Sequence, residues 1–466
     1  MPRWIQTLAR VLSFGAFVLG CNGGGPASPG GPDGGNPPAG ELVIVWDGRT
    51  VDWGAPDLLR AELDGEPAAV EWRSLSDQYA GKPVVLGRGP DVTTAALRPG
   101  TTVVEARILS GGSVLQRATV EVGVRYREAW NLDLLGMVPY DVETVGDVWV
   151  VEETAFVARR HAGGISIVDL AAMREIGRFT APDLFTQDVK AADGVAYVSD
   201  ESHIHPFAVT LLDVSDPADP QFLSGIPREV VGVAHNIWLD GPLLALASQA
   251  TGEIHLYDVS DPTGPLPLSR LPGHGTAHDV HVRDGLLFGS YMRVELLVAS
   301  IADPSHPLVL ARTAYPDAVN THSSWLTEDG RTLYVADEVA NAPIRIFDVS
   351  DPASPELLGT YQPRLGTIPH NFQVRDERFA YLSHYKHGVE VVDVSDPTQP
   401  RLVGFYDTHP GMVDDGEHVP TGSLSPSHEK EGGRFEGAWG VHWTDDGRIV
   451  VSDMNRGLFV FRYTGS

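Results

Sequence analysis

The stretch that decides the fold is Asp213-Val214-Ser215-Asp216-Pro217, because it recurs along the chain. Full copies begin at Asp258, Asp348 and Asp393, and a degenerate copy runs from Ser300 to Pro304. Successive copies start 45, 42, 48 and 45 residues apart. A period near 45 residues, filled by short apolar runs separated by Asp, Gly and Pro, is typical of β-propeller blades.

The acidic repeat itself is predicted to form turns. Asp and Ser side chains accept or donate hydrogen bonds to turn amides, and Pro removes a donor that a hairpin does not need. The alternative, a calcium loop, requires more oxygen ligands on one loop than this motif supplies. We therefore interpret the motif as the turn between the third and fourth strands of each blade.

The repeat unit can be counted by its first strand. Seven copies are found, starting near Asp147, Asp188, Asn236, Asp279, Ser323, Asn371 and Gly440. The last copy has three strands only, and Asn131 to Gly136 matches the fourth-strand pattern of Pro355 to Gly359. We therefore expect an all-β fold in which residues 130–466 form a seven-bladed β-propeller, closed by an N-terminal strand that completes the last blade.

The N-terminus has the features of an export signal. Arg3 and Arg10 precede the short apolar run Val11 to Leu19, and Val18 to Cys21 resembles a bacterial lipobox. This resemblance implies that residues 1–20 are a lipoprotein signal peptide and that the thiol of Cys21, the single cysteine, is lipidated. The alternative is an ordinary signal peptide with an incidental cysteine. Residues 21–40 are rich in Gly and Pro and are predicted to be a flexible tether.

Residues 41–125 change to short alternating strands. Examples are Leu42 to Trp46, Ala69 to Ser74, Val92 to Leu97 and Thr102 to Ile108, separated by turn signals such as Asp64-Gly65. The segment resembles a small immunoglobulin-like or PKD-like β-sandwich. We expect it to act as a spacer between the membrane and the propeller, with ligand binding as the alternative.

The charge balance limits the classes of partner. The chain has 34 Lys and Arg against 62 Asp and Glu, a formal net charge of -28. Such a surface repels phosphate backbones, so we expect no nucleic-acid partner. The expected location is outside the cytoplasm, with the chain anchored through Cys21 to a bacterial membrane, at the outer membrane or cell surface.

Several segments carry a family resemblance. The run Pro400 to Gly404, after the acidic turn, is similar to LVIVD repeats. Thr321 to Asp329, Pro369 to Phe372, Gly437 to Val441 and Ser452 to Val460 resemble the choice-of-anchor B family of bacterial surface proteins. The resemblance covers roughly residues 130–463. It implies the propeller architecture but no particular activity, because that family has no agreed one.

Four histidines occupy one repeated position. His235, His278, His322 and His370 each stand one residue before the first strand of a blade, where other blades have Gly146, Gln187 and Trp439. Since first strands surround the central channel of a propeller, these imidazoles are expected near one mouth of it. One interpretation is a site for one transition metal ion, zinc, copper or iron. The other is that each histidine only hydrogen-bonds a neighbouring blade.

Other side chains are predicted on the same face or in the channel. Asp279, Asp337 and Glu338 are candidates to orient the imidazoles. The full set of additional candidates is His281, His384, His387, His442, Asp279, Asp337, Glu338 and Trp439.

Two classes of function follow from these patterns. The first is a surface module that binds an unknown protein or small-molecule ligand, with a histidine-lined metal site at the channel mouth. The alternative is a metal-dependent enzyme outside the cytoplasm, because Leu382 to Gly388 resembles the methanethiol-oxidase and selenium-binding propellers. Catalytic residues cannot be assigned, since the sequence lacks a Gly-x-Ser-x-Gly elbow and a phosphate-binding loop.

Overall fold

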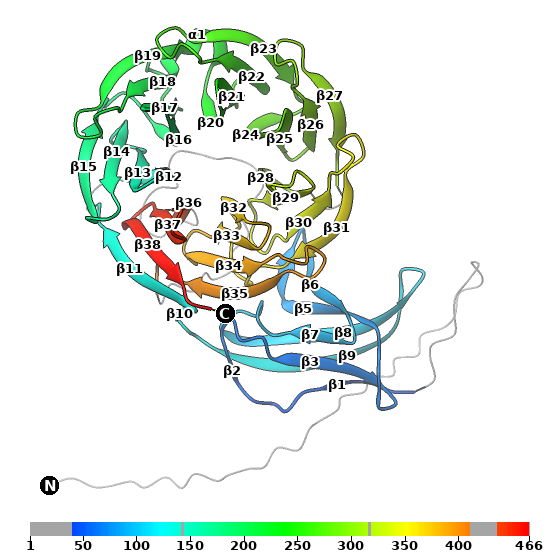
Figure 1. The fold of residues 1–466 in the computed structure, drawn as a ribbon. Helices are drawn as coiled ribbons and strands as arrows, with labels where there is room; N and C mark the ends of the chain where they lie inside the picture. The colour runs from blue at the N-terminus through cyan, green and yellow to red at the C-terminus, as the bar shows by residue number, and fades with distance from the viewer. Residues whose placement is uncertain (1–39, 141–143, 316–317, 411–435, 466) are drawn as a thin grey trace, which may run out of the picture.

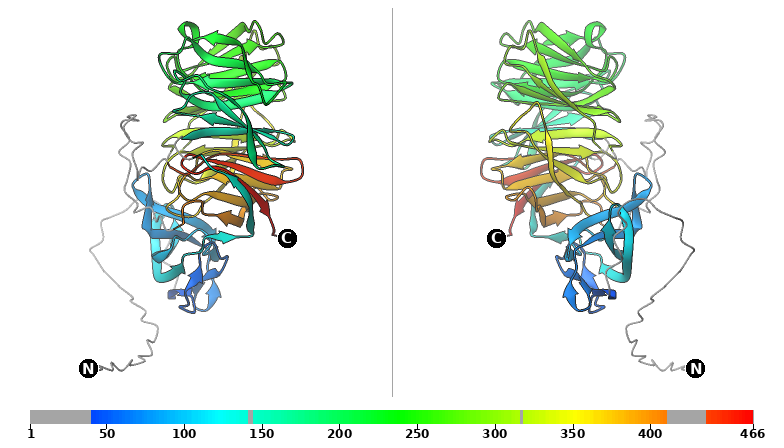
Figure 2. Two further views of the ribbon diagram at one scale, coloured as in Figure 1. Left: turned by 90° about the vertical axis from the view of Figure 1, so that its left-hand side faces the viewer. Right: turned by 90° about the vertical axis from the view of Figure 1, so that its right-hand side faces the viewer.

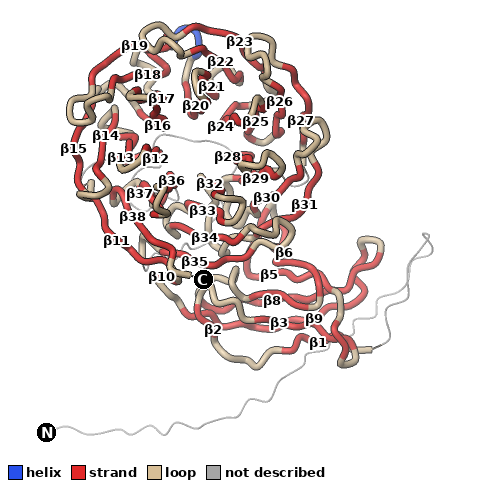
Figure 3. The backbone as a smooth tube through the Cα atoms, viewed as in Figure 1, coloured by secondary structure: helices blue, strands red, loops and turns tan. Residues whose placement is uncertain are grey.

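The computed structural model describes residues 40–140, 144–315, 318–410 and 436–465. The predicted signal peptide, Cys21 and nearly all of the predicted tether lie outside the described residues. Within them the fold is all-β, with one short helix, α1 (Arg228–Val231), at the edge of the molecule (Figure 3). The described part of the chain holds no helix with the length and apolarity needed to cross a bilayer.

Seven antiparallel sheets stand side by side in a ring (Figure 1). The strands of the first three sheets are β12 (Val145–Val151), β13 (Thr154–Arg159), β14 (Ile165–Asp169), β15 (Arg174–Phe179), β16 (Thr186–Ala192), β17 (Val195–Asp200), β18 (Phe207–Asp213), β19 (Gln221–Pro227), β20 (Ala234–Asp240), β21 (Leu243–Ser248), β22 (Glu253–Asp258) and β23 (Leu266–Pro272). The next three hold β24 (Thr276–Arg283), β25 (Leu286–Met292), β26 (Glu295–Ser300), β27 (Leu308–Thr313), β28 (Thr321–Leu326), β29 (Thr332–Asp337), β30 (Ile344–Asp348), β31 (Glu356–Tyr361), β32 (Phe372–Arg375), β33 (Phe379–Ser383), β34 (Val389–Asp393), β35 (Arg401–Tyr406) and β10 (Ala129–Trp130). The seventh holds β36 (Ala438–Trp443), β37 (Arg448–Asp453), β38 (Gly457–Tyr463) and β11 (Leu132–Val138).

The ring is closed by an early strand. Strand β11 pairs antiparallel with β38, from Leu132 opposite Tyr463 to Val138 opposite Leu458. This pairing confirms the prediction that a segment beginning near Asn131 completes the last sheet. Because the chain continues from β11 to β12 of the first sheet, this pairing joins the last sheet to the first and closes the ring.

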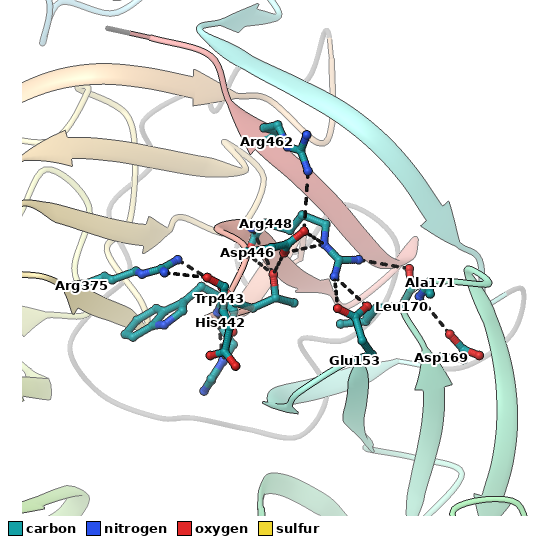
Figure 4. Close-up of polar contacts among 12 residues, drawn as sticks. Glu153, Asp169, Leu170, Ala171, Arg375, His442, Trp443, Asp446, Arg448 and Arg462 are labelled. Atoms are coloured by element: carbon teal, nitrogen blue, oxygen red, sulfur yellow. Dashed lines mark hydrogen bonds and ion pairs between the residues drawn. The ribbon is translucent and has the colours of Figure 1, made fainter.

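An arginine joins the last sheet to the first at this junction (Figure 4). The guanidinium of Arg448 donates to both carboxylate oxygens of Glu153, at 2.6 and 2.7 Å, and to Asp446 at 2.9 Å. Glu153 lies in the turn between β12 and β13, so these bonds connect residues 295 positions apart in the chain.

The acidic repeat forms turns, as predicted. Asp213 Oδ1 accepts hydrogen bonds from the backbone N–H of Ser215 at 3.0 Å and from its hydroxyl at 2.6 Å. The copy at Asp393 makes the same two bonds to Ser395, at 3.1 and 2.6 Å. The first aspartate of these copies therefore uses its carboxylate to stabilise its own turn.

The first strands of six sheets carry a β-bulge, and the pairing of β32 with β33 shows none. The pairing of β20 with β21 shifts between Ala234 and Asn236, and that of β24 with β25 between Ala277 and Asp279. A bulge lets two consecutive side chains face the same side of a sheet. Consequently His235, His278 and His322 and the residue after each of them face the axis of the ring. His370 and Asn371, just before β32, face it as well.

Two further sheets form the N-terminal domain, which packs beside the ring (Figure 2). Its strands are β1 (Leu42–Val45), β2 (Val51–Asp52), β3 (Leu58–Leu63), β4 (Glu66–Pro67), β5 (Val70–Tyr79), β6 (Lys82–Gly89), β7 (Asp91–Thr93), β8 (Gly100–Ser110) and β9 (Ser113–Arg125). The sequence did not predict β3 and β6. The strand expected over Val92 to Leu97 is shorter because the N–H of Leu97 bonds the carbonyl of Thr94 in a turn.

The N-terminal domain shares a core with the ring. Leu402 and Phe405 of β35 belong to the same apolar cluster as Trp53 of the N-terminal domain. The guanidinium of Arg364 lies over the Trp53 ring, 4.2 Å from its centroid, and Leu365 N–H donates to Ala96 O at 2.6 Å. The N-terminal domain is thus docked on the sheet of β32 to β35, a contact that the expected spacer role does not include.

Candidate functional site

The four histidines of the repeated position form one continuous row. Ring centroids lie 4.1 Å apart for His235 and His278, 4.2 Å for His278 and His322, and 4.5 Å for His322 and His370. Trp439 continues the row, 4.3 Å from His370. We call these five residues the histidine tier. The structure therefore brings all four predicted ligands, and Trp439, to one place.

The histidine tier borders a small cavity of about 20 Å³ at one end of the ring axis. Its lining consists of Asp147, Gln187, Asp188, His235, Asn236, His278, Asp279, His322, His370, Asn371 and Trp439. Every one of these residues belongs to a first strand or to the residues just before one, because the bulges direct two neighbouring side chains inward.

Backbone carbonyls fix two of the imidazoles. His278 Nδ1 lies 3.2 Å from His322 O, and His370 Nδ1 lies 2.7 Å from Trp439 O, each on the neighbouring sheet. A carbonyl oxygen only accepts, so Nδ1 carries the proton in both rings. Such bonds to a neighbouring blade are the alternative role that the sequence suggested for these histidines. They leave the lone pair of Nε2 available for a metal ion.

Two imidazoles and one carboxylate come close enough to share an ion. One ligand atom from each of His278, His322 and Glu338 lies within 4.8 Å of the other two. His322 Nε2 is 3.9 Å from Glu338 Oε2, and the Tyr385 hydroxyl donates to Glu338 Oε1. Nitrogen ligands with one carboxylate are a donor set that zinc takes in proteins. His235 and His370 flank this cluster.

The protonation states suit a cation. Burial lowers the pKa of His278 and of His322 well below the ordinary 6.5, which keeps both imidazoles neutral. Burial also raises the pKa of Glu338 to about 7, with Tyr385 acting in the opposite direction. With this pKa the Glu338 carboxyl is only partly ionised at neutral pH, because no neighbouring charge fully stabilises the ionised form. A bound cation would supply that charge.

His235 has a carboxylate partner that sequence reasoning missed. Its Nδ1 bonds Glu201 Oε1, and Gln187 Nε2 donates to Glu201 Oε2 at 2.5 Å. Burial alone would lower the pKa of His235, but Glu201 outweighs it and raises that pKa. Glu201 and Glu338 both follow an aspartate that ends the second strand of a sheet, and this Asp-Glu pair is the signal that would have identified Glu201.

Asp279 connects neighbouring sheets instead of orienting an imidazole. Its Oδ2 accepts from the N–H of Ser324 at 3.2 Å, as Asp188 Oδ2 accepts from Ile237 N–H at 2.9 Å. Burial raises the pKa of Asp279 to about 6. Asp279 lines both channel cavities, and among the described residues its carboxylate bonds the backbone of the next sheet and no imidazole.

A second cavity of about 40 Å³ lies deeper along the axis. Trp149, Trp238 and Trp325 line it, together with the buried Lys190, whose Nζ is 3.1 Å from Asp147 Oδ2. Lys190 also pairs with Asp188, and sequence reasoning missed this lysine. The signal was a lysine three residues after the position of the histidine tier, where the other sheets have tryptophan, histidine or glutamine.

His281 and His442 belong to this deeper layer. The His281 ring lies 4.2 Å from Trp238 and 4.9 Å from Trp325, and the His442 ring lies 4.5 Å from Trp149. Both stand three residues after the position of the histidine tier. They were predicted in the channel and lie there, but with the tryptophans and not in the ligand cluster.

Three predicted residues lie away from the channel. Asp337 Oδ2 accepts from the hydroxyl of Tyr79 at 2.7 Å and pairs with Arg345 Nη1 at 3.0 Å. His384 Nε2 is 3.4 Å from Glu390 Oε2, and the His387 ring meets Trp53 at 6.1 Å. None of the three is among the residues that line the two channel cavities. Asp337 and His387 contact the N-terminal domain, through Tyr79 and Trp53.

Comparisons with known proteins support the architecture. The LVIVD repeat family matches residues 330–362 and 376–408. The β-propeller domain of Myceliophteria thermophila Cps50 (Swd1) matches with a TM-score of 0.53 and 13% identity, over 71% of this chain and 99% of that domain. The fold is a β-propeller. The computationally designed Ika8 protein matches with a TM-score of 0.48 and 11% identity, over 71% of this chain and 99% of that chain. No curated protein matches the sequence.

Proposed function

We propose that this chain is a lipid-anchored, extracytoplasmic, seven-bladed propeller that binds one transition metal ion at the mouth of its channel and uses the metal to hold a ligand. The observation that carries the proposal is the cluster of His278, His322 and Glu338, with ligand atoms within 4.8 Å of one another. His235 and His370 flank this cluster and complete the row of histidines beside it.

The chemistry of the cluster favours zinc among the candidate metals. Three protein ligands leave a fourth tetrahedral position vacant, and zinc sites of this composition bind water or an exogenous ligand there. The cavity of about 20 Å³ beside the tier has room for a water molecule at that position. The alternative function, a metal-dependent enzyme, rests on the same vacant position, and the binding module is preferred because it requires no further group.

The anchor and the N-terminal domain complete the proposal. The lipobox-like run ending at Cys21 and the Gly and Pro-rich residues 21–40 support attachment to a membrane. The two packed sheets between residues 42 and 125 support the immunoglobulin-like assignment. The similarity of Thr321 to Asp329 and Ser452 to Val460 to choice-of-anchor B proteins supports a place on the cell surface.

Metal analysis tests the proposal directly. The mature chain, residues 21–466 with Cys21→Ser to prevent lipidation, is expected to retain about one zinc ion per chain after mild dialysis. The double variant His278→Ala and His322→Ala is expected to lose it. His255→Ala is the matched control, because His255 is buried on β22, away from the axis.

The contradicting result is equally concrete. If the wild-type chain contains no metal and gains no thermal stability from zinc, copper or iron salts, the metal site does not exist. If His255→Ala loses zinc as completely as the double variant, the metal is held elsewhere on the surface.

A further inference from the structure

The tip of the β5–β6 hairpin of the N-terminal domain touches the segment that carries Glu338. The Tyr79 hydroxyl donates to Asp337 Oδ2 at 2.7 Å, and Asn341 Nδ2 donates to Gln78 O at 3.1 Å. Figure 1 shows the hairpin lying against the ring next to β30 and β31. The N-terminal domain is therefore bonded to the residues on both sides of Glu338.

The residues that precede two of the proposed ligands share one hydrogen-bonding partner. The hydroxyl of Tyr315 lies 2.7 Å from Thr321 Oγ1 and 2.8 Å from Asp337 Oδ1. Thr321 and Asp337 are opposite each other in the pairing of β28 with β29. The next residue after Thr321 is His322 and the next after Asp337 is Glu338, so this bridge sets the relative position of two ligands.

Tyr79 completes the set of donors around the Asp337 carboxylate. Besides the two tyrosines, Arg345 Nη1 donates at 3.0 Å and Val319 N–H at 3.2 Å. Asp337 is fully buried. A buried carboxylate that loses a donor either stays under-bonded or shifts to find another partner, and a shift of Asp337 displaces Glu338 with it.

We propose that Tyr79 is a positioning residue for the metal site and that docking of the N-terminal domain is thereby coupled to metal affinity. This inference rests on the proposed metal site. The N-terminal domain then acts as more than a spacer. A binding partner or a mechanical force that separates the β5–β6 hairpin from the ring removes the Tyr79 bond to Asp337 and weakens metal binding. Because coupling is reciprocal, metal binding in turn strengthens the docking of the hairpin.

A matched pair of variants tests the coupling. Tyr79→Phe removes the hydroxyl that reaches Asp337. The control is Tyr126→Phe, which removes another hydroxyl of the N-terminal domain that donates to a buried carboxylate of the ring, Asp407 Oδ2, at 2.8 Å. Zinc affinity is measured by competition with a chromogenic chelator, and the Co²⁺-loaded forms are compared by their visible absorption spectra.

The expected result is specific to the hairpin. Tyr79→Phe raises the zinc Kd roughly 3- to 10-fold, less than the 10- to 100-fold typical for loss of a direct partner of a metal ligand, and changes the Co²⁺ spectrum. Tyr126→Phe leaves both unchanged. In the wild type, zinc slows amide hydrogen exchange in residues 76–82, and it does so less in Tyr79→Phe.

Two different failures are distinguishable. A wild-type chain that binds neither zinc nor Co²⁺ overturns the proposed metal site and the coupling together. A wild-type chain that binds zinc, with Tyr79→Phe and Tyr126→Phe equal to it in affinity, spectrum and exchange, overturns the coupling alone.

Discussion

The Nδ1 atom of His370 lies 2.7 Å from the carbonyl oxygen of Trp439, the residue at the equivalent position on the next sheet of the ring. His278 makes the same bond to the carbonyl of His322 at 3.2 Å. Histidines that bind metals commonly donate their second N–H to such an acceptor, which fixes the tautomer and the orientation of the ring. Packing between sheets and metal binding are therefore compatible roles for one imidazole.

The two roles are separable by substitution. His370→Ala removes one of two donors to the buried carbonyl of Trp439, which Ser383 Oγ also bonds at 2.6 Å, so we expect it to lower the free energy of unfolding by about 1 kcal/mol. Because His370 lies outside the three-ligand cluster, the variant is expected to retain its zinc. Urea unfolding and elemental analysis of the same sample measure the two effects.

His322→Ala is the reciprocal case. The structure gives His322 Nδ1 no hydrogen-bonding partner among the described residues, so this variant is expected to lose zinc and to be less destabilised than His370→Ala when both are compared without metal. Loss of zinc in His370→Ala with retention in His322→Ala would contradict the assignment of the ligands.

Arg448 is expected to stabilise the closed ring. Its guanidinium binds Glu153 of the first sheet through both carboxylate oxygens and Asp446 of its own turn. Since both partners are more than half exposed, we expect Arg448→Ala to lower the free energy of unfolding by only about 1 kcal/mol. Arg401→Ala, which breaks an exposed pair with Asp393 within one sheet, is the control and is expected to cost less than about 0.5 kcal/mol.

The anchor prediction concerns Cys21. If its thiol is lipidated, the wild-type chain expressed in its bacterial host fractionates with membranes and labels with an alkyne-bearing fatty acid. Cys21→Ser is expected to abolish labelling and to move the chain to the soluble extracytoplasmic fraction. A Cys21→Ser chain that remains with the membranes would show that another segment attaches it.

The architecture of the ring could be predicted because its signals are local and repeated. The Asp213 side chain bonds Ser215, two positions later, so the turn depends only on local sequence and each copy of the motif marks one blade. The strand beginning at Leu132 could be matched to a fourth-strand pattern elsewhere in the chain. The row of histidines followed from the same alignment, because equivalent positions of a repeat face the same axis.

The neighbours of the site could not be predicted, because they depend on contacts between distant segments. Asp337 was assigned to the channel, yet its partner Tyr79 is 258 residues earlier in the chain. The repeat alignment places Lys190 in the channel but gives no signal of its buried pairing with Asp147, 43 residues away on the previous sheet. Periodicity predicts which face a side chain takes and does not predict what packs against that face.

A buried ion pair at the contact between the domains gives the stability a defined pH dependence. Glu390 Oε1 accepts from Arg364 Nε at 2.7 Å, and both residues are fully buried, as is His384 beside them. Burial favours the protonated carboxyl, but His384 and Arg364 outweigh it and hold the pKa of Glu390 far below the ordinary 4.5. The unfolded chain therefore binds this proton first as the pH falls.

This order of protonation determines how the free energy of unfolding changes with pH. The stabilisation from Glu390 is complete above its ordinary pKa of 4.5 and is lost progressively as the pH falls below it. The double variant Arg364→Met and Glu390→Gln removes both charges, avoids an unpaired buried ion, and keeps an apolar side chain over Trp53. We expect the free energy of unfolding of the wild type, relative to this variant, to fall by about 1–2 kcal/mol between pH 7 and pH 3. Parallel curves for the two proteins over this range would contradict the prediction, since every other carboxyl group is common to both.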